Sequence, residues 1–112
     1  MIMTDFSQAG LSLATITTTL GATAATAALA ATASAVSITA SGNRIVLNFA
    51  DLAAALELWK PWGSAAKRAD FMLRFEGMLL RLNVAIEFRV NGKLLGGFGP
   101  NTQPGFIRRL IA

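Results

Sequence analysis

Two short motifs in this sequence have residue types and spacings that suit chemistry. Ser64-Ala-Ala-Lys67 has the S-x-x-K spacing that pairs a serine nucleophile with a lysine. Gly96-Gly-Phe-Gly99 is a glycine-rich segment of the kind whose backbone can approach a phosphate group closely. Each motif also has a structural interpretation that needs no ligand, and the surrounding residues decide between the two.

The serine motif is better explained as the start of a helix. Enzymes that use S-x-x-K also need S-D-N and K-T-G elements in a far larger fold, and this chain of 112 residues has neither. Serine is a favoured N-cap residue, so we expect Ser64 to cap a helix that exposes Lys67. The glycine segment lacks the G-x-G-x-x-G spacing and the Walker lysine. We interpret its glycines as a bulge or as the close approach of another backbone.

The ionisable residues do not form a catalytic or metal-binding constellation. The sequence contains no His and no Cys, which removes the usual proton-transfer, nucleophilic and thiolate groups. No pair of acidic residues has a spacing that argues for acid–base work, and no oxygen cluster suits a cation. The acidic residues are scattered through unlike segments: Asp5, Asp51, Glu57, Asp70, Glu76 and Glu87. We therefore expect no enzyme activity, no cofactor and no metal.

An uncharged N-terminal run dominates the chain. Residues 6–43 carry no charged side chain, and from position 11 to position 41 they are almost all Ala, Thr and Ser. Such a segment is too apolar for a solvated loop and too poor in large side chains to form a core alone. It needs a partner surface, either protein or lipid. We therefore divide the chain into an assembly or membrane segment, 1–43, and a compact α+β domain, 44–112.

The N-terminal run is predicted to be one long helix over about residues 6–35. Leu13, Ile16 and Leu20 lie on one helical face, and alanines continue the same stripe. The threonines oppose a helix because they restrict χ1, and partial alternation near residues 11–19 leaves a strand as the competing interpretation. Small residues on this stripe would let a second helix approach closely.

Alternating apolar residues predict two β-hairpins in the rest of the chain. The first covers about residues 36–49, and the second joins residues 84–90 to 93–98 through Asn91-Gly92, the sequence typical of a type I′ turn. A two-residue turn there pairs Phe88 with Leu95. This register places Phe98 on the face of Glu87 and Arg89, so the hairpin would be apolar on both faces.

Helical periodicity predicts two to three helices around these hairpins. Asp51 is expected to cap a short helix that ends near Trp59, and Ser64 a longer one over about residues 65–82. A last amphipathic turn covers residues 106–111. The predicted fold class is therefore α+β: a long Ala/Thr-rich N-terminal helix followed by a small domain of two β-hairpins and two to three helices.

The composition favours association with another surface. Apolar residues make up 54% of the chain and charged residues 14%, whereas ordinary soluble domains have roughly 45–50% and 25%. About 40% of the unfolded surface stays exposed at this size, so a monomer hides the apolar excess with difficulty. We predict a structural homo-oligomer, such as a ring, shell or filament, built by apolar subunit contacts. The expected contact residues are Leu13, Ile16, Leu20, Ala24, Ala28, Leu94, Phe98, Phe106 and Leu110.

A single-span membrane protein is the first alternative. The uncharged run is long enough to span a bilayer, but twelve hydroxyl side chains between positions 11 and 41 make its insertion marginal. Every Lys and Arg lies at or after Arg44, which would place a small basic domain in the cytoplasm. Residues 1–10 contain no basic residue, so we expect no cleaved secretory signal. A cytoplasmic or membrane-associated location is favoured.

A nucleic-acid-binding module is the second alternative. Aromatic residues lie beside some of the basic ones, as on proteins that bind single strands. A net charge of +4 is low for affinity that must come from neutralising phosphates, and most basic residues fit the solvated faces of helices. The basic residues considered are Lys60, Lys67, Arg68, Arg74, Arg81, Arg89, Lys93, Arg108 and Arg109.

Overall fold

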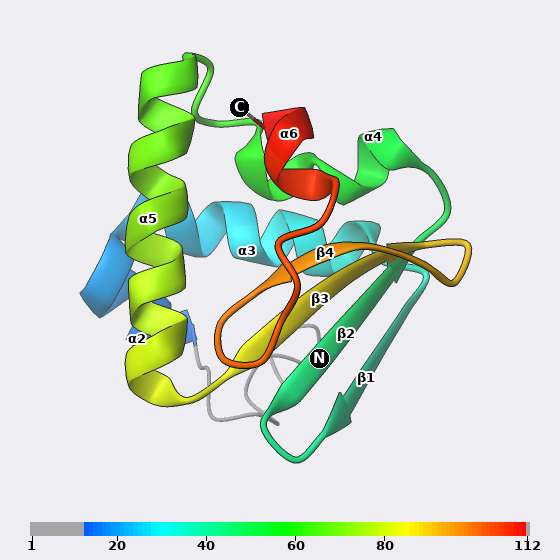
Figure 1. Cartoon of the computed structure of the whole chain (residues 1–112). Coiled ribbons are helices and arrows are strands. Elements are labelled where there is room, and N and C mark those ends of the chain that lie inside the picture. Colours follow the sequence, from blue (N-terminus) through cyan, green and yellow to red (C-terminus); the bar gives the residue numbers. More distant parts are fainter. Residues whose placement is uncertain (1–12, 112) are drawn as a thin grey trace.

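The structure, a computed structural model, describes residues 13–111 (Figure 1). In this part the chain is a mixed α+β fold with one four-stranded sheet and five α-helices. In chain order the elements are α2 (Leu13–Leu20), α3 (Ala22–Ser34), β1 (Ser37–Ser41), β2 (Arg44–Phe49), α4 (Leu52–Ala55), η1 (Glu57–Trp59), α5 (Ala65–Leu82), β3 (Ala85–Val90), β4 (Lys93–Phe98) and α6 (Ile107–Ile111).

The two predicted hairpins are confirmed, and they join into a single sheet. The strand order is β1-β2-β3-β4, in which the two hairpin pairs are antiparallel and β2 pairs with β3 in parallel. A parallel pair needs a crossover connection, and α4, η1 and α5 supply it. Figure 1 shows the helices on one side of the sheet. We call the side under the helices the inner face and the other side the outer face.

Local signals explain the boundaries of the helices that were predicted correctly. The Oδ1 atom of Asp51 accepts a hydrogen bond from the Ala54 N–H at 2.8 Å, and the Ser64 Oγ accepts one from the Lys67 N–H at 3.2 Å. Each bond satisfies an amide that a helix start leaves unpaired. The helix predicted over about residues 65–82 is confirmed as α5, and Asn83 ends it in the left-handed conformation with φ 54°. The helix after Asp51 is shorter than predicted, because it passes into η1.

The prediction of one long N-terminal helix is wrong within the described residues. Gly21 has φ 101°, a conformation outside the helical region, and it separates α2 from α3. This break lets α3 pack on η1 and α4. The alanines of α3 become part of the core of the same chain, with Ala24 1% and Ala28 2% exposed. Residues 37–41, also in the predicted N-terminal segment, form β1 of the sheet.

The core is an aromatic cluster between the sheet and the helices. The indole of Trp59 is 2% exposed and lies at its centre. Its ring centroid is 5.5 Å from that of Phe71, 6.0 Å from Phe75, 6.1 Å from Phe88 and 5.2 Å from Phe98. These separations are typical of favourable aromatic pairs. The cluster joins η1, α5, β3 and β4 into one hydrophobic unit.

A β-bulge changes the predicted register of the second hairpin. Asn91 and Gly92 have φ 51° and 81°, as a type I′ turn requires, but Phe88 pairs with Gly96 and not with Leu95. Leu95 is the extra residue of the bulge. Beyond it the faces exchange, so Phe98 pairs with Ile86 and lies fully buried on the inner face. The prediction that Phe98 shares a face with Glu87 is wrong.

Candidate self-association surface

The two edges of the sheet differ, and one of them has no partner in the part of the chain that the structure describes. β1 pairs with β2 on one side only, and among residues 13–111 no segment pairs with its other side. We call this side of β1 the open edge. Ser37, Thr39 and Ser41 are exposed, while Ile38 and Ala40 are half-buried toward the inner face. An unpaired strand presents a row of backbone donors and acceptors to other chains.

The turn determines which backbone groups the open edge presents. Gly42 and Asn43 form a two-residue connection between β1 and β2, and Gly42 has φ 61°. In such a hairpin the closing pair, Ser41 with Arg44, is hydrogen-bonded, and bonded and non-bonded pairs then alternate. The N–H and C=O groups of Ile38 and Ala40 are therefore the ones that point away from β2.

The strand at the open edge lacks two of the features that normally prevent edge pairing, a charge and a proline. Proteins protect edge strands with charges, prolines or bulges. The Ser-Ile-Thr-Ala-Ser sequence of β1 contains no charge and no proline. Each of the other three described strands carries at least one charged residue. The lack of charge over residues 37–41 was visible in the sequence, but that this strand lies at an edge follows only from the strand order.

The opposite edge, along β4, is closed by the chain itself. After β4 the chain turns back, and the Gly97 N–H donates to the Gln103 carbonyl at 2.8 Å. The glycines allow this contact. A Cβ on Gly96 would lie 2.0 Å from the Pro104 carbonyl oxygen, and one on Gly105 would lie 2.4 Å from that of Leu95. The Gly96-Gly-Phe-Gly99 motif thus serves the close approach of another backbone, together with the bulge.

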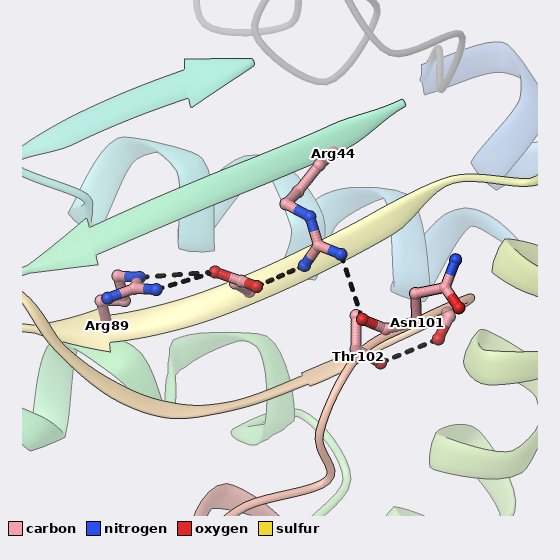
Figure 2. A network of polar contacts seen from close by, with 6 residues as sticks. Arg44, Arg89, Asn101 and Thr102 are labelled. Carbon is pink, nitrogen blue, oxygen red and sulfur yellow. Dashed lines mark hydrogen bonds and ion pairs between the residues drawn. The ribbon is translucent and has the colours of Figure 1, made fainter. Parts of the chain in front are cut away.

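A polar network holds the outer face of the sheet (Figure 2). The Glu87 carboxylate accepts hydrogen bonds from Arg44 Nη1 and, at 3.2 Å, from Arg89 Nη2. Arg44 Nη2 also donates to the Asn101 carbonyl at 3.1 Å, and the Thr102 hydroxyl donates to the Gly99 carbonyl at 2.8 Å. The network therefore ties β2, β3 and the returning segment together. Both arginines are paired, which lowers the charge that this face offers to a phosphate backbone.

We expect Glu87→Gln to lower the free energy of unfolding by about 1–3 kcal/mol, because it leaves two half-buried arginines without their carboxylate. The Glu87 side chain is 14% exposed. Asp70→Asn is the control, since the Asp70–Arg74 pair is 3.1 Å long but 66% and 53% exposed, and its loss should cost less than about 0.5 kcal/mol. Urea unfolding of both variants measures the difference. Equal effects would show that the network is not structural.

Most of the predicted contact residues lie inside one copy of the chain. Among the side chains that the structure describes, the predicted contact residues fall into a buried or half-buried group and an exposed group. Ile16, Ala24, Ala28 and Phe98 are buried and Leu20 is half-buried, while Leu94 is 40% and Phe106 50% exposed. The side chains of Leu13 and Leu110 lie outside the described part. A role of these residues in self-association stays a prediction, and the buried ones are not available to a partner without a rearrangement.

The described residues contain no helix that is long and apolar enough to cross a membrane. Within the same residues no group of three or more acidic side chains could hold a metal ion. Comparisons with protein-family models, with curated proteins and with solved structures find no match. The sheet edges and the exposed surface are therefore the features that bear on function.

Proposed function

We propose that this protein is a structural subunit that associates with copies of itself through the open edge of β1. The observation that supports the proposal is the contrast between the two edges. The chain covers the edge of β4 with its own backbone, through Gly97 and Gln103, whereas β1 carries no charge and has no further partner among residues 13–111. A protein that functions as a monomer is expected to protect both edges.

The energetics predict a reversible contact. Pairing two five-residue edges forms about four backbone hydrogen bonds, each with a net value of about 1 kcal/mol. Association costs at least about 4 kcal/mol in lost translational and rotational freedom. Apolar contacts must therefore contribute, and Val36 (66% exposed) lies directly before the edge strand. We expect the oligomer to dissociate on dilution.

A second exposed surface would extend pairs of subunits into a larger assembly. α5 presents Leu73 and Leu80, which are 72% and 54% exposed, on the side of the helix that faces solvent. Gly77 lies between them on the same helical face, with nothing within 4 Å of the position of a Cβ. Two different self-contacts on one subunit generate rings or filaments, according to whether the rotation closes.

Thr39→Lys tests the role of the open edge. A monomer tolerates lysine at an exposed edge position, but in the dimer the two lysines place like charges in the interface. We therefore expect the dissociation constant of the dimer to rise at least about tenfold. Sedimentation velocity from about 1 µM to 1 mM measures this. Gln103→Lys adds the same charge at an exposed position beside the opposite edge of the sheet and should leave the dimer unchanged. Urea unfolding should show that both variants remain folded.

Sedimentation, membrane fractionation and a nucleic-acid titration together distinguish this function from the two alternatives. A wild-type chain that remains monomeric throughout this range would contradict the proposal. A chain recovered with membranes and released only by detergent would favour the membrane alternative. Binding to nucleic acid that weakens steeply with salt would favour the other one.

A further inference from the structure

We infer that two copies pair β1 with β1 in antiparallel orientation about a two-fold axis that passes beside Thr39. The inference rests on the proposed self-association and specifies its geometry. Ser37, Thr39 and Ser41 lie on the outer face, and Ile38 and Ala40 on the inner face. In an antiparallel pair, side chains of directly opposed residues lie on the same face. Two-fold symmetry therefore allows only registers that oppose odd with odd and even with even positions.

Backbone hydrogen bonding selects one of these registers. Ile38 and Ala40 present their N–H and C=O groups at the open edge, because they occupy the non-hydrogen-bonded positions of the pair with β2. A register centred on Thr39 opposes Ile38 with Ala40 of the second copy, twice, and satisfies about eight groups with four bonds. Centring on Ile38 would require Val36, whose N–H already donates to the Asn48 carbonyl at 2.8 Å. Centring on Ala40 would require Gly42, which lies in the turn.

The side chains of β1 are complementary in the same register. The large Ile38 lies opposite the small Ala40 of the second copy, so the inner face has space for the isoleucine. On the outer face Thr39 lies opposite itself, and Ser37 lies opposite Ser41. Paired threonines and serines are favourable across strands. The edge carries no charge, so nothing in the strand repels its own copy.

The resulting dimer has a continuous sheet of eight strands, four from each copy. Because inner residues oppose inner residues, the helices of both copies lie on the same side of this sheet. The outer edges of the long sheet are then the two β4 edges, which the returning segment of each copy covers. The pairing is closed, and it leaves the Leu73 and Leu80 surface of α5 exposed.

Single-cysteine variants of the full chain test the register, because the natural sequence contains no cysteine. Ser37→Cys, Thr39→Cys and Ser41→Cys all lie at exposed positions, so the fold should tolerate them. Opposed residues in a non-hydrogen-bonded pair have Cα atoms about 4.5 Å apart, within the range of a disulfide. Four residues out of register add about 14 Å, which is too far.

We expect Thr39→Cys to form a covalent dimer under mild oxidation at least about tenfold faster than Ser37→Cys or Ser41→Cys alone, as separated by non-reducing electrophoresis. An equal mixture of Ser37→Cys and Ser41→Cys should cross-link at about half the rate of Thr39→Cys, because about half of the dimers then contain one copy of each variant. In urea the chains are unfolded and meet at random, so all three single variants should cross-link at similar rates. Faster self-cross-linking of Ser37→Cys or Ser41→Cys would overturn the register while self-association stands. A chain that sediments as a monomer and does not cross-link at Thr39 above the urea rate would overturn both.

Discussion

Gly96→Ala should lower the free energy of unfolding by about 3 kcal/mol or more. The new methyl group would lie 2.0 Å from the Pro104 carbonyl oxygen and 2.8 Å from Ile107 Cγ2, and Gly96 has φ +142°, which L side chains rarely adopt. Relief of the clash requires the returning segment to leave β4. A domain of this size is typically stable by about 5–15 kcal/mol, so the loss is a large part of the total. Urea unfolding followed by circular dichroism measures it.

Gly77→Ala is the matched control for this substitution. Gly77 lies within α5, has no positive φ, and has nothing within 4 Å of the position of a Cβ. Alanine is the better helix former, so this change should stabilise the protein by about 0.5–1 kcal/mol. The same chemical change is thus expected to act in opposite directions at the two positions. Similar effects at both would show that the segment after β4 does not cover that edge.

Trp59→Ala should be comparably damaging, with a loss of about 3–5 kcal/mol in the free energy of unfolding. The indole contacts four phenylalanine rings of the core, from α5, β3 and β4. Its removal leaves a cavity between the sheet and the helices, and the neighbouring side chains can fill it only in part. Leu73→Ala, at a position 72% exposed, serves as the surface control and should change stability by less than about 0.5 kcal/mol.

Trp59→Phe separates the ring from its N–H group. The indole Nε1 atom is buried and has no hydrogen-bond partner in the described part of the structure. An unsatisfied buried donor costs about 1–3 kcal/mol, so phenylalanine removes an unfavourable term while it keeps the aromatic contacts. We expect Trp59→Phe to cost less than half as much as Trp59→Ala. Equal losses would show that the polar N–H contributes to stability through a bond to water.

The elements that were predicted correctly from the sequence are those specified by local signals. Asp51, Ser64 and Asn91-Gly92 act on their own neighbours, so a cap or a turn follows from a few residues. The amphipathic face of α5 is equally local. Together with the alternation of apolar residues along the strands, these signals located both hairpins and the longest helix within one or two residues.

The features that were missed depend on contacts between distant residues. Gly21 breaks the N-terminal helix because α3 must pack on η1, some 30 residues later in the chain. The bulge at Leu95 accompanies the contact of Gly97 with Gln103, which no periodicity in β4 reveals. β1 lies at the edge of the described sheet because β2 pairs in parallel with β3 on its other side. None of these can be derived from a window of ten residues.

The returning segment over β4 has a consequence for how far association can proceed. A sheet with two unpaired edges can add copies without limit, as cross-β fibres do. In the proposed dimer, β1 of each copy is paired and the returning segment covers β4, so strand addition would stop after a single step. The segment around Gln103 and Pro104 would prevent a further strand from pairing with β4. Loss of this segment from the proposed dimer is expected to expose both β4 edges, so that further copies could add to the sheet.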